Sequence, residues 1–277
     1  MLNVELPERM DCPFSSELNI EHSKLNIMSI VLLTKRIEFA ASHRYIKPEW
    51  DEAKNRAVFG ACYNPPAHGH NYLLEVTVSG EIDPKTGMVV NLFDLKRVLL
   101  AVIEEFDHKN LNLDMPYFND RIPTSENLAR VLWTKLAPQR DIGTLHTIRL
   151  CEDEDLYADV TAAGGLDVAD VTRRYSFTAI QEGNQGREWD CFVTVRGTID
   201  PVTGMVTDIG ALDRLVQDKV VKAFDRQDLC HIFGAEHVTG GQLAERIWKS
   251  LVSGISTGKL ANVRLVQSRD LSFDYAG

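Results

Sequence analysis

The segment Asp83-Pro-Lys-Thr-Gly-Met-Val89 occurs a second time, almost unchanged, as Asp200-Pro-Val-Thr-Gly-Met-Val206. The surrounding landmarks recur at nearly the same spacing, since Trp133 has its counterpart in Trp248. A repeat of about 115 residues is far too long for one solenoid unit, which spans roughly 20 to 50 residues. The sequence therefore indicates two copies of one domain in a single chain.

Each copy shows the same order of expected elements: two strands, two helices and two more strands. In the first copy the strands alternate apolar and polar residues, and the helices carry apolar residues at helical spacing. These elements are the strands Ile37–His43 and Leu73–Ile82, the helices Leu92–Phe106 and Ser125–Leu136, and the closing strands His146–Cys151 and Leu156–Val160. Thr124 is the expected N-cap of the second helix, followed by the acid Glu126. The fold class is therefore α+β, with a four-stranded antiparallel sheet and two helices on one face in each unit.

The expected domains are residues 30–161 and 166–277, joined by the linker Thr161-Ala-Ala-Gly-Gly165. Residues 1–29 show no clear periodicity and are expected to form an N-terminal tail. Met28 lies just before the first strand, so we hypothesise that translation begins there, which the intact mass of the native protein would test.

A four-stranded sheet with two helices leaves bare strand edges, and such edges need partners. Pairing several units into a closed barrel removes the edges altogether. We therefore expect the two units to pair within one chain and then with other chains, which makes the protein a homo-oligomer.

The composition limits the class of protein and the kinds of partner that it can bind. With 277 residues the chain has room for two ordinary domains, and 44% hydrophobic with 25% charged residues is typical of a soluble globular protein. The sequence contains neither an apolar stretch long enough to span a bilayer nor a signal peptide pattern. Five irregularly spaced cysteines favour a reducing compartment, so a cytoplasmic location is expected. The net charge of −10 argues against nucleic acid as a partner.

Three histidines are placed to share one metal ion. His68 and His70 are two residues apart, so on a strand both side chains leave the same face. His43 ends the run Phe39-Ala-Ala-Ser-His43, which also has the pattern of a strand. If the two strands pair, three neutral imidazoles converge and leave a fourth position open, which is typical of a catalytic zinc site. Iron and nickel also accept imidazole and remain alternatives.

Cys62 precedes His68 by a short loop and is the candidate general base. A free cysteine is commonly a small buried apolar residue. Beside Zn²⁺, however, the thiolate would be favoured and the pKa of the thiol lowered.

Five motifs, in order and spread over residues 33–160, resemble the 6-pyruvoyl-tetrahydropterin synthase family, which also holds the 6-carboxytetrahydropterin synthases of queuosine biosynthesis. The motifs are Phe-Ala-Ala-Ser-His43, Cys62-x5-His68-Gly-His70-Asn-Tyr, Asp107-His108-Lys-Asn-Leu, Pro-Thr124-Ser125-Glu126-Asn and Leu150-Cys-Glu152. The resemblance implies the tunnelling fold (T-fold), in which sheets close into a barrel with active sites between units.

The resemblance also implies roles for single residues. Zn²⁺ on His43, His68 and His70 would bind the hydroxyls of the substrate side chain. Cys62, Asp107 and His108 would form a proton relay, although neighbouring residues in an extended turn are expected to point apart. The carboxylate of Glu152 would bind the amino-pyrimidine edge of a pterin through two parallel hydrogen bonds, and Thr124 and Ser125 would contact its ring. Glu126 is assigned to the same site, although a helix N-terminus alone explains an acid there.

The second half resembles the same fold without its chemistry. Gln181, Gln185 and Arg187 stand where His43, His68 and His70 stand in the first copy, and the segment carrying Cys62 has no counterpart. Likewise Asp225-Arg226 replaces Asp107-His108, Gly241 replaces Glu126, and Gln267 replaces Glu152. We expect this half to complete a barrel or to shape a neighbouring site.

The leading hypothesis is a zinc-dependent lyase that converts 7,8-dihydroneopterin triphosphate to 6-pyruvoyl-tetrahydropterin and triphosphate. One alternative is a 6-carboxy-5,6,7,8-tetrahydropterin synthase of queuosine biosynthesis. The other is a non-catalytic pterin- or purine-binding T-fold protein. The residues that would bind the triphosphate are left open: Lys96, Arg97 and Lys109 lie near the motifs, but solvated charges explain them equally well.

Overall fold

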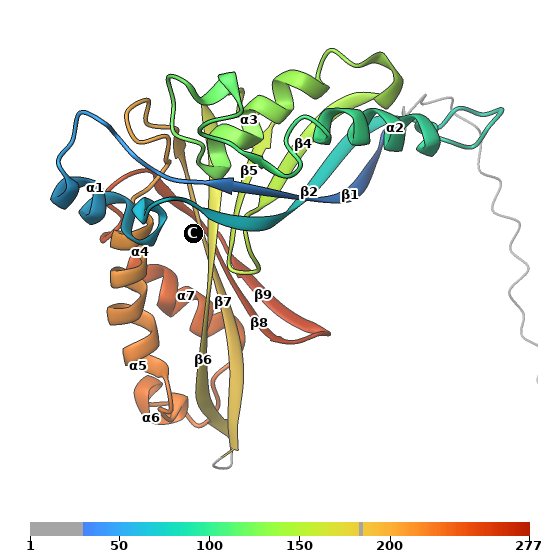
Figure 1. Cartoon of the computed structure of the whole chain (residues 1–277). Coiled ribbons are helices and arrows are strands. Elements are labelled where there is room, and N and C mark those ends of the chain that lie inside the picture. The colour runs from blue at the N-terminus through green and yellow to red at the C-terminus, as the bar shows by residue number, and fades with distance from the viewer. Residues whose placement is uncertain (1–29, 183–184) are drawn as a thin grey trace, which may run out of the picture.

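The computed structural model describes residues 30–182 and 185–277, so the expected tail 1–29 lies outside the described residues. Figure 1 shows the elements in chain order. The first half contains β1 (Ile30–His43), α1 (Glu52–Phe59), β2 (His68–Glu81), α2 (Leu92–Ile103), β3 (Lys109–Asn110), α3 (Ser125–Leu136), β4 (Thr144–Cys151) and β5 (Leu156–Thr161). The second half contains β6 (Val168–Glu182), β7 (Gln185–Thr198), α4 (Ile209–Val216), α5 (Lys222–Phe224), α6 (Leu229–Phe233), α7 (Gly240–Leu251), β8 (Lys259–Ser268) and β9 (Leu271–Tyr275).

All strands belong to one sheet in the order β3-β1-β2-β4-β5-β6-β7-β8-β9. Its long strands pair antiparallel, and the short β3 pairs parallel with the end of β1. The two halves join where β5 pairs with β6, with Ala158 opposite Val171. Figure 1 shows how strongly the sheet twists: β1 and β2 run across the view, whereas β6 and β7 run down it.

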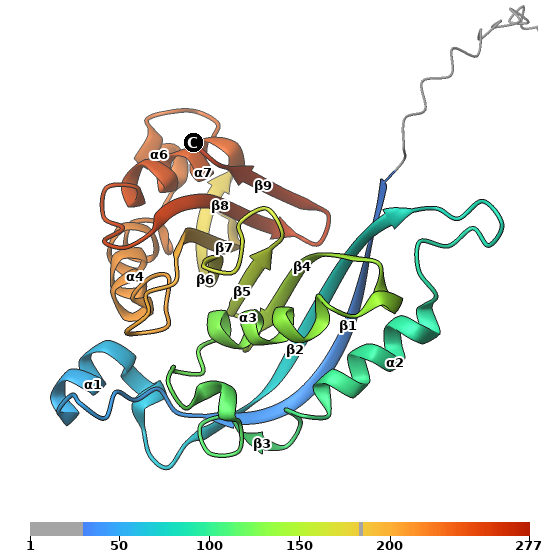
Figure 2. The ribbon, with the colours of Figure 1, turned by 90° about the horizontal axis from the view of Figure 1, so that it is seen from above.

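Helices cover one face of this sheet and create the core. In Figure 2, α2 and α3 lie over the strands of the first half, and α4 to α7 lie over those of the second. The side chains beneath them come from alternate strand positions, such as Leu74 and Val76 of β2 and Val193 and Val195 of β7, and all four are fully buried. Between them lie polar residues of the other face, such as Arg149 of β4, which pairs with Asp159 at 2.7 Å. One buried hydrophobic cluster runs through both halves.

The expected α+β fold is confirmed, and the predicted strands and helices follow in the predicted order, with β3, α5 and α6 as unpredicted additions. Thr124 caps α3 as predicted, because its side chain accepts a hydrogen bond from the backbone N–H of Asn127. β1 begins seven residues before the predicted Ile37. The sequence analysis missed α1, which Asp51 caps, because this helix buries only Asn55 and Phe59 and so lacks an apolar stripe.

Within residues 30–182 and 185–277, none of the helices has both the length and the apolar character needed to cross a membrane. The cytoplasmic location stays a prediction.

Candidate active site

The pairing of β1 with β2 brings the three histidines together as predicted. His43 lies directly opposite His68, and His70 lies opposite Ala41. All three have the same strand parity as the buried Phe39 and Tyr72 side chains, so they point to the face that the helices cover. The three imidazoles therefore lie on the same face of the sheet because side chains alternate between the two faces along a strand.

The ring of His43 is held in one tautomer. Its Nδ1 lies 3.2 Å from the carbonyl oxygen of Pro123 and 2.9 Å from the hydroxyl of Tyr72. A carbonyl oxygen can only accept a hydrogen bond, so Nδ1 carries the proton and the Nε2 lone pair remains free. Metal-binding histidines are generally oriented in this way, by a hydrogen bond from the ring nitrogen that does not bind the metal.

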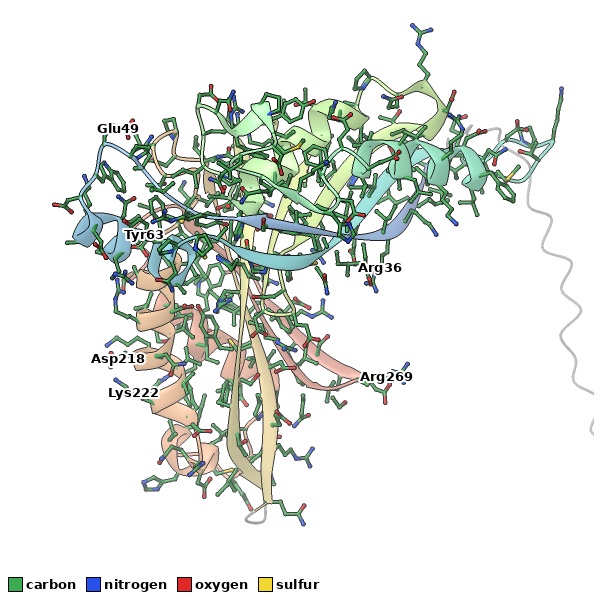
Figure 3. All side chains as sticks on the ribbon, in the orientation of Figure 1. Arg36, Glu49, Tyr63, Asp218, Lys222 and Arg269 are labelled. Carbon is green, nitrogen blue, oxygen red and sulfur yellow. The ribbon has the colours of Figure 1, made fainter. Side chains whose placement is uncertain are left out.

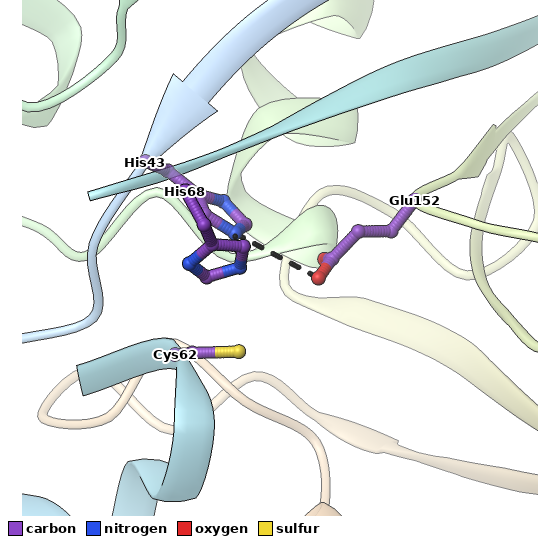
Figure 4. Close-up of side chains that lie close together, drawn as sticks. All are labelled: His43, Cys62, His68 and Glu152. Atoms are coloured by element: carbon purple, nitrogen blue, oxygen red, sulfur yellow. Dashed lines mark hydrogen bonds and ion pairs between the residues drawn. The ribbon is translucent and has the colours of Figure 1, made fainter. Parts of the chain in front are cut away.

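The three Nε2 atoms meet at a spacing that suits a metal ion. Those of His68 and His70 each lie 3.1 Å from that of His43. Nitrogens bound at about 2.0–2.1 Å in tetrahedral geometry are about 3.3 Å apart, so the donor set fits such an ion. Figure 4 shows the Cys62 and Glu152 side chains beside His43 and His68, and the ligand atoms of these four residues lie within 4.8 Å of one another. We call His43, His68, His70, Cys62 and Glu152 the metal cluster.

Two histidines of the metal cluster, His43 and His68, have lowered pKa values. Burial, with smaller contributions from the neighbouring rings of His70 and His68, lowers the pKa of His43 to about 3. Burial also lowers the pKa of His68, again with His70 contributing. Both imidazoles are therefore neutral near pH 7, as coordination requires.

Glu152 links the metal cluster to α3. Its Oε2 accepts hydrogen bonds from Ser125 Oγ at 2.5 Å and from Tyr45 OH at 3.1 Å. Its Oε1 lies 3.4 Å from His70 Nε2 and 3.7 Å from His43 Nε2. The sequence analysis missed Tyr45, although it follows His43 by two residues and an extended chain would place both on one side.

Cys62 lies in the 3-10 turn Gly60–Tyr63, directly after α1, and is half-buried. Burial, with a smaller contribution from Glu152, raises the pKa of its thiol to about 12, although Arg173 of β6 opposes the shift. The expected low pKa of Cys62 therefore does not come from the protein groups alone. A bound cation would have to supply it.

A cavity of about 560 Å³ extends from the metal cluster to the second half of the chain. Its walls include Cys62, His68 and Glu152 from the first half and Arg173, Met205 and Arg214 from the second half. Ser125 and Glu126 also line it, but Thr124 does not. The cavity is concave, largely apolar and open at one end, which suits a small planar molecule with polar groups at its ends.

The sequence profile described as 6-pyruvoyl tetrahydropterin synthase matches residues 32–163 and 182–277. The chain belongs to this family. The human 6-pyruvoyl tetrahydrobiopterin synthase is 44% identical over 124 residues, which are 44% of this chain and 86% of the human protein. A protein of Archaeoglobus fulgidus, provisionally named a 6-carboxy-5,6,7,8-tetrahydropterin synthase, is 38% identical over 93 residues, 34% of this chain and 74% of its own length. The solved 6-pyruvoyl tetrahydropterin synthase of Caenorhabditis elegans is 33% identical, with a TM-score of 0.47, and the match covers 49% of this chain and 97% of that one.

Asp107 and His108 do not line this cavity. Asp107 Oδ1 accepts the backbone N–H of Ala40 at 2.8 Å, and its Oδ2 lies 2.9 Å from His108 Nδ1. The prediction that the two side chains point apart is therefore wrong. The reason is the left-handed backbone of His108, with φ of 58°, which turns its ring back toward Asp107. His108 is exposed and lines a second pocket, which shares His70 with the cavity.

The N-terminus of α3 contacts the second half of the chain. Thr124 Oγ1 donates to the carbonyl oxygen of Gly204 at 2.6 Å, and the N–H of Val206 donates to Glu126 Oε1 at 2.9 Å. Gly204 is required there because its φ is +75° and a Cβ would stand 2.5 Å from Asn127 Nδ2. Thr124 and Glu126 thus hold the repeated Asp-Pro-Xaa-Thr-Gly turn, a role that the sequence analysis did not anticipate. Their role in binding a substrate stays a prediction.

The second half repeats this geometry with neutral side chains. Gln181 Nε2 donates to the carbonyl oxygen of Val238 at 2.6 Å, just as His43 faces Pro123. Gln267 Nε2 donates to Gln181 Oε1 at 2.8 Å, at the positions equivalent to Glu152 and His43. Amide groups replace the imidazole and the carboxylate, and an amide is a poor ligand for zinc.

Glu126 makes the stability of the protein depend on pH. Burial raises the pKa of this carboxyl from 4.5 to about 7, although the N–H of Val206 opposes the shift. The folded state therefore binds more protons than the unfolded state between these values, and the stabilisation present below pH 4.5 is lost as the pH rises through 7. Relative to Glu126→Gln, the wild type is expected to lose up to about 3 kcal/mol of unfolding free energy between about pH 5 and pH 8.

Chemical denaturation of both proteins at the two pH values, after removal of metal, measures this difference. Glutamine keeps the acceptor for Val206 but does not titrate, so it is the matched control. Equal pH dependence in the two proteins would contradict the assignment.

Proposed function

We propose that this protein is a metal-dependent lyase that converts 7,8-dihydroneopterin triphosphate to 6-pyruvoyl-tetrahydropterin and triphosphate. The observation that carries the proposal is the convergence of three imidazole Nε2 atoms with a thiol and a buried carboxylate in one cavity. Family membership supports the same chemistry. The reaction needs no nicotinamide or flavin, because hydrogen moves from the substrate side chain to the pterin ring before triphosphate leaves.

We propose zinc as the metal, held by His43, His68 and His70. Three nitrogen donors with room for a further ligand support this choice. When bound, the cation supplies positive charge that stabilises an alkoxide or enolate on the substrate side chain.

The remaining roles belong to side chains of the protein. Cys62 Sγ would take the proton from the side-chain carbon of the substrate, as a general base. Glu152 would accept hydrogen bonds from the amino-pyrimidine edge, while Ser125 and Tyr45 hold its carboxylate in place. Asp107 and His108 stay predicted members of a proton relay, since they do not line the cavity with Cys62.

We propose that residues 30–161 form the catalytic domain and residues 166–277 a domain without its own metal site. The glutamines at positions 181 and 267 support this division. The second domain then serves the site of the first by forming the far wall of the cavity.

We further propose that neighbouring chains join through the same kind of contact that joins the two halves of one chain. Met205 of the second-half turn is 7% exposed because α3 covers that turn, whereas its first-half counterpart, Met88, is 42% exposed. Phe93 at the start of α2 is 87% exposed, and among residues 30–182 and 185–277 the outer edge of β9 pairs with no strand and that of β1 pairs only with the short β3. The internal pairing of β5 with β6 is a template by which β9 of one copy would pair with β1 of another.

Light scattering should therefore give a mass that is a multiple of the 31.2 kDa of one chain. Phe93→Asp would bury a charge in the proposed contact and is expected to lower the assembled mass. An assembly of unchanged mass in this variant would contradict the contact.

Incubation of the metal-loaded protein with 7,8-dihydroneopterin triphosphate, followed by mass analysis of the products, tests the proposed reaction. We expect 6-pyruvoyl-tetrahydropterin and inorganic triphosphate. Acetaldehyde with a 6-carboxy product would assign the protein to the branch of the Archaeoglobus relative. A fully metal-loaded protein that turns over no dihydropterin would favour the non-catalytic binding protein.

A further inference from the structure

Two arginines of the second half line the cavity that holds the metal cluster. Arg173 lies on β6 and Arg214 in the last turn of α4. A third, Arg56 of α1, lies in the same wall but is engaged by Glu52 at 3.1 Å. The cationic part of the cavity is therefore supplied largely by the half that lacks metal ligands.

Arg173 is held in place by a short network. Its Nε lies 3.4 Å from Asp213 Oδ1, which also accepts the hydroxyl of Tyr175 at 2.8 Å. Asp213 therefore shares its charge between two donors, and within the described part of the chain the terminal nitrogens of the Arg173 guanidinium have no hydrogen-bond partner. A fixed guanidinium in a cavity wall is well suited to phosphate oxygens.

Arg214 is free of the partners that its counterpart has. The equivalent residue of the first half, Arg97, pairs with Asp94 at 3.2 Å and with Asp141 at 3.1 Å. The positions that correspond to these two acids are Ala211 and Ser256 in the second half. Among the described residues, Arg214 accordingly makes no ion pair.

The backbone of Gly210 lies close to Arg214. Gly210, at the start of α4, lines the cavity, and a Cβ there would stand 3.3 Å from Asp208 Oδ1 and 3.4 Å from Arg214 Nη1, so a larger residue would crowd this arginine. Its first-half counterpart is the large side chain of Phe93. The second half therefore has a small residue beside Arg214 where the first half has a large one.

Four carboxylates line the cavity together with the arginines: Glu126, Glu152, Asp153 and Asp213. Glu152 is bonded by Ser125 and Tyr45, and Glu126 by the N–H of Val206. Asp213 accepts from Arg173 and Tyr175. Three of these acids thus already have donors within the protein, and Arg214 is not among those donors.

We propose that Arg173 and Arg214 bind the phosphate chain of the substrate, so that the second half is retained as its anion-binding wall. This inference rests on the proposed function, because it assumes that the pterin end lies at the metal cluster. The sequence analysis considered Lys96, Arg97 and Lys109 for this role, all in the first half. Arg97 is instead tied to its two acids.

Calorimetric titration of the metal-loaded full chain with inorganic tripolyphosphate tests the inference without turnover. Arg173→Gln and Arg214→Gln are each expected to weaken binding by about tenfold or more, since each removes a charge-assisted hydrogen-bond donor. Arg269→Gln is the matched control, because Arg269 is an exposed arginine of the same half that lies far from the cavity (Figure 3). Binding of 7,8-dihydroneopterin without phosphates should be the same in all four proteins.

Equal tripolyphosphate affinity in the wild type and in all three variants would overturn the inference, as would a wild type that does not bind the anion. If Arg173→Gln fails to fold because Asp213 loses its partner, the exposed Arg214 decides the outcome alone. Arginine-dependent binding in a protein without lyase activity would keep the anion site and remove the proposed reaction. Turnover in a protein whose tripolyphosphate binding does not depend on the arginines would keep the proposed reaction and remove the anion site.

Discussion

Replacement of Cys62 with alanine is expected to lower turnover of 7,8-dihydroneopterin triphosphate by about 10²- to 10⁴-fold, the usual contribution of a general acid or base. The thiol lies within 4.8 Å of the ligand atoms of His43 and His68, so it can reach a substrate held there. The metal content should stay unchanged, because the three imidazoles supply the donor set by themselves. Elemental analysis and product formation, measured on the same sample, separate the two effects.

Cys230→Ser is the matched control for this change. Cys230 lies on α6 of the second half, and its thiol donates to the carbonyl oxygen of Gln181, a bond that serine can replace. Its activity should equal that of the wild type. A Cys62→Ala protein that loses its metal together with its activity would make Cys62 a ligand rather than a base.

Replacement of His68 with alanine is expected to remove stoichiometric metal and, with it, all measurable turnover. His68 supplies one of only three nitrogens that meet at the metal cluster, and zinc retained by two protein nitrogens would lack the donor set of a stable site. His68 is only half-buried, so the fold should survive the change. Elemental analysis after dialysis against buffer without metal gives the result.

His146→Ala provides the control, since His146 is an exposed residue of β4 that bonds the neighbouring Thr147. It should keep both metal and activity. Full metal occupancy in His68→Ala would show that the ion is held elsewhere, and the assignment of the three histidines would then fall.

Much of the fold could be predicted because its signals are local. The alternation of apolar residues identified the long strands, and the cap at Thr124 identified the start of α3. The spacing of His68 and His70 predicted that both rings share one face, and the strand pairing confirms it. The exposed α1 escaped prediction because it carries no apolar stripe, and β1 starts earlier than predicted, at the apolar run Ile30-Val-Leu-Leu33.

The candidate site was predictable to the extent that it depends on strand parity. His43, His68, His70 and Glu152 all lie at the end of one sheet face, and the period of two is written in the sequence. Tyr45 and Ser125 are different, because their hydroxyls reach Glu152 from separate segments that only folding brings together. The same holds for Asp107, whose carboxylate is used by the backbone of Ala40.

By itself, the sequence determined that this protein is a duplicated α+β unit in which one copy holds three convergent imidazoles, because repeats and strand periodicity are properties of the chain. The tertiary structure alone decided what the second copy contributes. Pairing β5 with β6 places Arg173 and Arg214 in the wall of the cavity that Cys62 also lines, although more than a hundred residues separate them from that thiol. Such a contact depends on the register and twist of the sheet, and no local pattern records either.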